Sequence, residues 1–108
     1  MNLLRPVLAL SLAATSFLSA FASSAAKSRG AQVYAGSDCR HCHTIRQDGG
    51  GSKGPDLSGV GRILNKSQIR IQILHGGHQM PPFADILQKS EVDDLVAYLH
   101  SCRDKKPK

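Results

Sequence analysis

Two cysteines and a histidine stand close together where residues 39–43 read C-R-H-C-H. The spacing Cys-x-x-Cys-His is the attachment signature of c-type haem. Two thiols three residues apart, on about one helical turn, can each form a thioether with one vinyl group of a porphyrin. His43 then stands at the ring face, whereas His41 lies inside the motif and should point away. The motif predicts covalent attachment through Cys39 and Cys42, with His43 as the proximal iron ligand.

Three other interpretations of the cysteine pair stay open on the motif alone. Cys39 and Cys42 could form a thioredoxin-like redox dithiol, because nearby positive charge lowers a thiol pKa, but the sequence shows no β-α-β context for it. They could form half of a zinc site with His75 and His78, although these histidines are closer together than the usual zinc spacing. They could also form a structural disulfide.

A second axial ligand is predicted where residues 78–83 read H-Q-M-P-P-F. Met80 is the only methionine besides the initiator, and two prolines stiffen the backbone beside it. A thioether is a soft ligand suited to low-spin iron, and His/Met ligation gives a higher potential than two histidines. His75 and His78 are rival ligands. The rigid loop favours Met80 as the distal ligand.

The length and composition indicate one small globular domain. The chain has 108 residues, of which 41% are hydrophobic and 20% charged, so a large enzyme with its own substrate domain is excluded. A domain of this size often needs a metal, a disulfide or a cofactor to complete its core. Fourteen lysines and arginines against eight acids give a net charge of +6.

The N-terminal segment has the pattern of a cleaved secretory signal peptide over residues 1–22. Arg5 supplies the positive start, residues 6–26 carry no charge, and Ala20-Phe21-Ala22 is an A-x-A cleavage pattern. An uncleaved membrane anchor is the alternative, since the uncharged stretch could just span a bilayer. Cleavage predicts a periplasmic or otherwise exported protein, which disfavours nucleic acid as a partner.

The elements around the motif are less clear. Residues 27–38 have moderate helical character, and residues 44–61 are rich in glycine, with a flexible surface excursion expected at 47–52. Residues 67–74 are ambiguous, because alternating isoleucines fit a strand. Ser67 as an N-cap, isoleucines four residues apart and two following glycines fit a helix instead.

The last element is predicted as a helix that begins at Ser90. Ser90 is a suitable N-cap, and acids follow it in the first turn. An apolar stripe then follows helical spacing at Val92, Leu95, Val96 and Leu99. Cys102 continues the stripe and is expected to be a small buried hydrophobic residue.

Taken together, these residues resemble the small class I cytochromes c, each with one haem. The resemblance covers most of residues 28–102, through Gly30, Tyr34, the C-R-H-C-H motif, K-G-P-D-L at 53–57, M-P-P-F at 80–83 and L-V-A-Y-L at 95–99. It implies an all-α fold of three to five short helices wrapped around one covalently bound haem c. It also implies that the first and last helices cross at Gly30, that residues 67–74 are helical, and that the Pro55 carbonyl accepts the ring N–H of His43.

The resemblance gives a haem domain over residues 23–102 and a basic tail over residues 103–108, which is expected to be solvated. The chain departs from the family in two places. Cys102 is an extra thiol that leaves room for a mixed disulfide or a dimer, and the glycines at 49–51 lengthen the loop after the motif.

The expected function is one-electron transfer between exported or membrane-bound redox partners, without a catalytic residue or substrate. With both axial positions filled, the iron has no open site, so catalysis is disfavoured. Lys53, Lys66 and Lys89 are candidates to steer the carrier to acidic docking surfaces, with membrane contact only through such partners. The alternatives are a haem-binding subunit of a larger oxidoreductase, a small haem peroxidase or gas sensor, and a zinc-binding module without haem.

Overall fold

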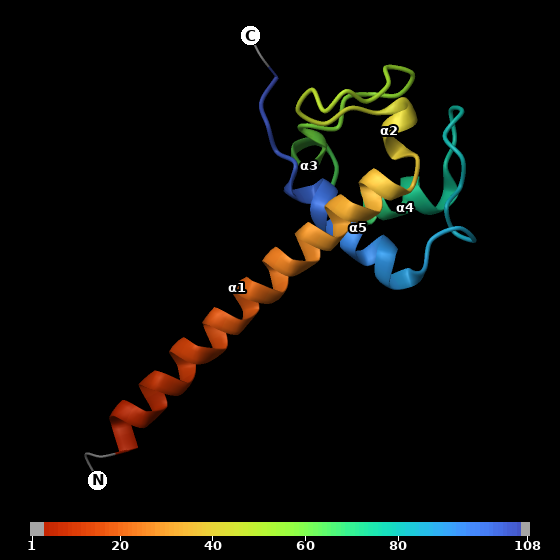
Figure 1. The fold of residues 1–108 in the computed structure, drawn as a ribbon. Helices are drawn as coiled ribbons and strands as arrows, with labels where there is room; N and C mark the ends of the chain where they lie inside the picture. The colour runs from red at the N-terminus through yellow and green to blue at the C-terminus, as the bar shows by residue number, and fades with distance from the viewer. Residues whose placement is uncertain (1–3, 107–108) are drawn as a thin grey trace.

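The computed structural model describes residues 4–106, with side chains described from Phe17 onward. Five helices and no strand are found in this part of the chain, which confirms the all-α prediction (Figure 1). They are α1 (Leu4–Gly36), α2 (Cys39–Cys42), α3 (Val60–Ile63), α4 (Lys66–His75) and α5 (Lys89–Ser101). The first helix is long rather than short, and its N-terminal part stands away from the body formed by the rest.

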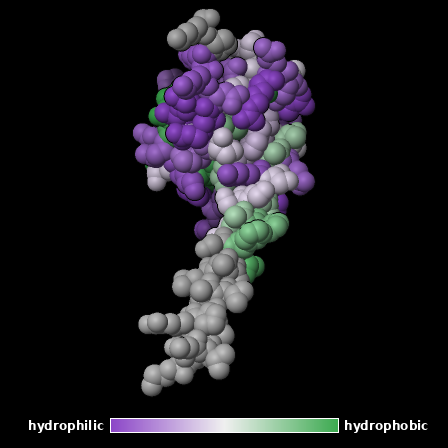
Figure 2. All heavy atoms as spheres, turned by 90° about the vertical axis from the view of Figure 1, so that its left-hand side faces the viewer, coloured by the Kyte–Doolittle hydropathy of each residue, from purple (hydrophilic) through white to green (hydrophobic). Residues whose placement is uncertain are grey.

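Helix α1 runs without a break through the predicted cleavage position after Ala22. The helix predicted at residues 27–38 is therefore the C-terminal part of a longer one, and it ends at Gly36. Phe17, Leu18 and Phe21 are exposed where α1 leaves the body, and apolar residues gather there in Figure 2. Among the described helices, none combines the length and apolar character needed to cross a bilayer.

Helices α1 and α5 cross in direct contact at Gly30, as the resemblance implies. A Cβ atom on Gly30 would lie 2.0 Å from the backbone oxygen of Asp94 and 2.6 Å from the Cβ of Tyr98, so only glycine allows this approach. The Tyr34 and Tyr98 rings pack beside the crossing with centroids 6.0 Å apart. Arg29 donates two hydrogen bonds to Asp94 across the same interface.

Helix α5 forms the centre of the core. Val92, Leu95, Val96 and Leu99 are all buried, which confirms the predicted stripe, and each contributes about 2 kcal/mol by leaving water. The predicted start at Ser90 is wrong. Gln88 is the N-cap, because its side chain and that of Glu91 satisfy each other's backbone N–H groups, so Ser90 lies inside the helix.

Cys102 lies directly after α5 and is 1% exposed, so it packs as the small hydrophobic residue expected. Burial raises the pKa of its thiol, and Sγ donates to the Tyr98 carbonyl at 3.4 Å. The thiol is therefore inside the fold, where a mixed disulfide or a dimer bond would require the chain end to open.

Helix α4 resolves the ambiguous segment as a helix. Ile69 and Ile73 are buried one turn apart, whereas Ile71 between them is 58% exposed. The predicted N-cap at Ser67 is wrong, because Asn65 caps the helix through a reciprocal pair of hydrogen bonds with Gln68. Gly76 ends the helix with a φ of 65°, a conformation that favours glycine.

The loop between α2 and α3 is packed rather than a free surface excursion. The N–H of Gly51 donates to the Arg40 carbonyl at 2.8 Å, and a Cβ on Gly50 would lie 1.9 Å from the His43 carbonyl oxygen. The Arg40 guanidinium also pairs with Asp48. The loop therefore folds back on the segment that carries the cysteine motif, and it ends where α3 begins at Val60.

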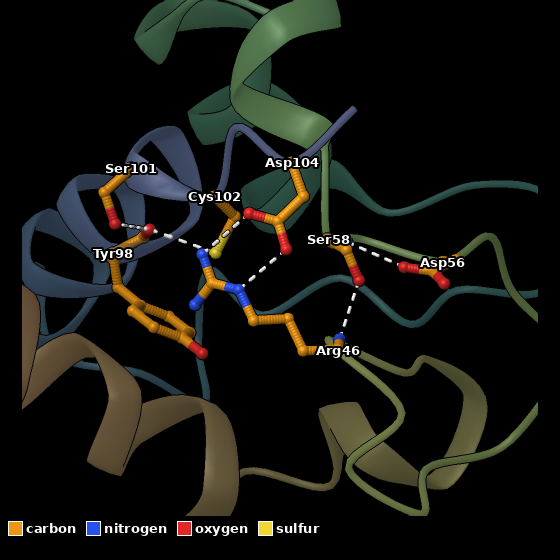
Figure 3. A network of polar contacts seen from close by, with 7 residues as sticks. All are labelled: Arg46, Asp56, Ser58, Tyr98, Ser101, Cys102 and Asp104. Carbon is orange, nitrogen blue, oxygen red and sulfur yellow. Dashed lines mark hydrogen bonds and ion pairs between the residues drawn. The ribbon is translucent and has the colours of Figure 1, made fainter. Parts of the chain in front are cut away.

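The first residues of the basic tail are tied to this loop (Figure 3). Arg46 donates from Nε and a terminal nitrogen to the two carboxylate oxygens of Asp104, at 2.8 and 3.0 Å. The Asp104 N–H donates to the Ser58 carbonyl, and the Arg103 guanidinium to the Gly61 carbonyl. The start of the tail is thus tied to the fold, while residues 103–106 all stay exposed, as expected of a solvated tail.

Candidate haem-binding site

An apolar cavity lies among the ends of four elements and brings together three of the predicted site residues. Cys39, His43 and Met80 all line it. The other lining residues come from α1, α4, α5 and the loops between helices, and most of them are apolar: Tyr34, Leu57, Ile73, Phe83, Leu87, Leu95 and Leu99. A histidine and a methionine that face one apolar space are the arrangement expected of two axial ligands.

The two cysteines lie at opposite ends of the one-turn helix α2. Both are free and half-buried, and Cys39 lines the cavity, whereas Cys42 is not among its lining residues. Burial raises the pKa of the Cys39 thiol. This is opposite to the lowered pKa of a reactive redox dithiol, so the thioredoxin-like interpretation gains no support.

The imidazole of His43 is held by its backbone surroundings. Its Nδ1 lies 2.7 Å from the carbonyl oxygen of Pro55, the contact that the family resemblance implies for this pair. Because a carbonyl can only accept, Nδ1 carries the proton and Nε2 keeps its lone pair free for a metal. A Cβ on Gly54 would lie 2.6 Å from the ring carbon Cε1, so the glycine lets the backbone pass directly against the imidazole.

Met80 is presented by a tight turn that follows α4. Gly77 and Met80 exchange two backbone hydrogen bonds, of 2.9 and 3.0 Å, around the two central residues His78 and Gln79. Both central residues have positive φ values, 52° and 75°, as in the type I′ turn. Gln72 on α4 donates through Nε2 to the Met80 sulfur at 3.7 Å and to the Gly76 carbonyl at 3.1 Å.

The rival histidines do not take part in this cavity. His41, His75 and His78 are exposed, and none of them lines it. In the part of the chain that the structure describes, no three His, Cys, Asp or Glu residues are grouped as a metal would need. The zinc site of Cys39, Cys42, His75 and His78 is therefore not assembled there.

Two residues of the site carry little signal in the sequence. In the sequence, Gln72 is a polar residue within a segment whose structure is ambiguous. It contacts the Met80 sulfur only because the turn after α4 reverses the chain. Tyr34 is part of the family resemblance, but its hydroxyl contact with the His43 carbonyl oxygen, at 3.3 Å, depends on how α1 ends. A search for polar residues one or two turns before a Gly-Gly pair would have found Gln72.

Comparison with protein families identifies the class of protein to which the chain belongs. A family model described as cytochrome c oxidase, cbb3-type, subunit III matches residues 25–99 of the chain. The chain belongs to this family of small c-type cytochromes. Membership implies haem c and haem-based electron transfer. No curated protein and no solved structure matches the chain significantly.

The residues of this cytochrome fit the prosthetic group that the family implies. Cys39 and Cys42 are free thiols at the spacing that two thioethers need. The hydrogen bond from Nδ1 of His43 to the Pro55 carbonyl leaves the Nε2 lone pair available for a metal. Apolar side chains from three helices line the same space, as a porphyrin ring requires. The donor set, one imidazole and one thioether, suits iron in a low-spin state.

Proposed function

We propose that this cytochrome is an exported carrier of single electrons with one haem, bound through Cys39 and Cys42 and ligated by His43 and Met80. The observation that carries the proposal is the cavity that His43 and Met80 both line, with Cys39 at its edge. The bound haem would supply the change between ferric and ferrous iron. His43 and Met80 would hold the iron from two sides and leave no position open for a substrate, so no catalytic role is proposed.

The remaining residues of the site set the properties of the carrier. Pro55 orients the imidazole and keeps its proton on Nδ1, which makes Nε2 a stronger ligand. Leu57, Phe83, Leu95 and Leu99 line the cavity with apolar surface. When haem is bound, this low polarity would raise the potential of a neutral His/Met site. The role proposed for these residues is therefore to hold the haem, to orient its histidine ligand and to shield it from water.

The test is a spectrum and a redox titration of the purified protein from a host that matures c-type cytochromes. The wild type should show a Soret band that survives acid–acetone extraction, which demonstrates covalent attachment. Met80→Ala should lower the midpoint potential and let carbon monoxide bind the reduced iron. His75→Ala, outside the turn that presents Met80, is the matched control and should change neither property. A colourless wild type, or a Met80→Ala protein with unchanged spectrum and potential, would contradict the proposal.

A second candidate function is a haem-binding subunit of a larger oxidoreductase. The description of the matching family, a subunit of a cytochrome c oxidase, favours it. Copurification after mild membrane solubilisation distinguishes the two functions: a free carrier elutes alone in the periplasmic fraction, whereas a subunit elutes with partners. The same fractions, analysed by mass spectrometry, show whether the mature chain begins after Ala22.

A further inference from the structure

A second hollow lies on the surface beside the cavity of His43 and Met80. It is bounded by the C-terminal end of α1, the segment after Met80 and the first turn of α5. Its lining, here named the acidic groove, consists of Gly36, Ser37, Asp38, Pro81, Phe83, Ile86, Leu87 and Glu91. Phe83 and Leu87 line both the groove and the cavity. A molecule seated in the groove is therefore separated from the candidate haem site by single side chains.

The floor of the groove is apolar and partly uncovered. Ile86 is 63% exposed and Pro81 is exposed as well, whereas Phe83 is buried and lines both this floor and the cavity. Because most of its surface stays in water, Ile86 contributes little to the stability of the fold. Apolar patches with a polar rim are typical of surfaces that bind other proteins.

The rim of the groove carries negative charge that the fold leaves without a counter-ion. Asp38 and Glu91 line the groove, and Asp85 precedes Ile86 on the same turn. None of these three carboxylates forms an ion pair among the described residues. The acids that do form ion pairs are Asp48, Asp93, Asp94 and Asp104.

The sign of this rim is opposite to that of the whole chain. None of the lining residues is a lysine or arginine. The candidate steering residues Lys53, Lys66 and Lys89 line neither the groove nor the cavity, and Lys89 is paired with Asp93 at 3.1 Å. Asp38 is the N-cap of α2, but its side chain makes no capping hydrogen bond there.

We propose that the acidic groove is the docking surface for a redox protein whose contact patch is apolar at its centre and carries lysine or arginine at its edge. The proposal rests on the electron-carrier function proposed above. At contact distance the charges at the interface determine which partner is attracted, because charges farther away than about 8–10 Å are largely screened at physiological salt. The net charge of the chain therefore does not determine the partner. A partner with an acidic docking patch, as the net charge suggests, is the outcome that would contradict this proposal.

The experiment uses the reduced, haem-loaded protein and two small oxidants of opposite charge, tris(phenanthroline)cobalt(III) and hexacyanoferrate(III). Stopped-flow oxidation rates are measured at increasing salt. With the cationic oxidant the rate should fall as salt rises. Asp38→Asn/Glu91→Gln should lower that rate about ten-fold at low salt and leave it unchanged at high salt. Asp56→Asn/Asp104→Asn makes the same change in net charge away from the groove and is the matched control.

The apolar floor is tested separately with protein oxidants. Ile86→Ser keeps every charge, and it should slow oxidation by a lysine-rich mitochondrial cytochrome c several-fold while leaving the rate with the small cation unchanged. An acidic plastocyanin should react more slowly than the basic protein. If Ile86→Ser has no effect on the protein reaction, the groove is not the contact surface.

Other outcomes would overturn the docking proposal without touching the carrier function. A rate with the anionic oxidant that falls with salt, together with unchanged rates in Asp38→Asn/Glu91→Gln, would place positive charge at the reactive surface. A changed visible spectrum in that double variant would mean that the haem itself fills the groove. A wild type without a Soret band would overturn both proposals, so the two failures are distinguishable.

Discussion

The side-chain nitrogen Nε2 of Gln72 lies 3.7 Å from the sulfur of Met80, and it also lies 3.1 Å from the carbonyl oxygen of Gly76. Its two N–H groups can thus serve one acceptor each. A thioether sulfur has two lone pairs, so it can accept from Gln72 with one and ligate a metal with the other. Such a hydrogen bond withdraws electron density from the sulfur and holds it in a fixed direction.

We therefore expect Gln72→Leu to lower the midpoint potential and to raise the affinity of the ferric protein for imidazole about five-fold. The factor corresponds to about 1 kcal/mol, the usual net contribution of a hydrogen bond. Ser67→Ala, an exposed substitution on the same helix, is the control and should change neither value. If Gln72→Leu lowered only the thermal stability, Gln72 would serve the helix end at Gly76 and not the sulfur.

A methyl group at Gly54 should disturb the proximal side. The added Cβ would lie 2.6 and 2.8 Å from Cε1 and Nδ1 of His43, so the imidazole or its bond to Pro55 must shift. Gly54→Ala should reduce the yield of haem-loaded protein and cost about 1–3 kcal/mol of unfolding free energy, as overpacking does. Gly36→Ala is the control, because its Cβ meets nothing within 4 Å. Equal yields and midpoints for both variants would show that His43 is free to move.

The helices could be predicted where a periodic pattern meets a buried surface. The stripe on α5 is a local signal, whereas the close approach at Gly30 is implied only by the family resemblance, and both describe the packing correctly. The predicted starts of α4 and α5 are each two residues late, because the choice of serine as N-cap rests on residue type alone. Asn65 and Gln88 are the N-caps instead, because each forms reciprocal hydrogen bonds with the residue three positions later. That spacing can be recognised in the sequence.

Other features depend on partners distant in the sequence, and no local pattern reveals them. Arg46 and Asp104 are 58 residues apart, and their pairing turns a glycine-rich loop and a basic tail into one packed corner. The acidic rim of the groove also depends on residues that are distant in the sequence. Asp38 and Glu91 come together only when the end of α1 lies against the start of α5, so the total charge of the chain gave the opposite expectation.

The turn that presents Met80 should be strained at its second central residue. Gln79 has a φ of 75°, in the left-handed region that costs a residue with a side chain about 1–2 kcal/mol. Gln79→Gly should hold Met80 more firmly and weaken imidazole binding to the ferric protein, whereas β-branched Gln79→Val should strengthen it. Gln47→Val is the matched control, since Gln47 also has a positive φ, 58°, but lies outside this turn. An equal effect of the two valine substitutions on imidazole affinity would contradict this account.

The pairing of Arg46 with Asp104 should make part of the stability depend on pH. The guanidinium donates to the carboxylate and attracts it, which holds the pKa of Asp104 below its ordinary value. The pKa is thus lower in the folded than in the unfolded chain, where it is about 3.9. The contribution is therefore complete above that pH, and it is lost as the pH falls through the folded-state pKa.

Urea unfolding at a series of pH values tests this pairing. The wild type should be more stable than Asp104→Asn above about pH 5, and the difference should shrink toward zero as the carboxylate becomes protonated in both states. Arg46→Gln should show the same convergence, because it removes the other partner. Ser67→Ala serves as the control with no titrating group. A difference between wild type and Asp104→Asn that stays constant down to acid pH would mean that Asp104 acts through its backbone bond to Ser58 rather than through its charge.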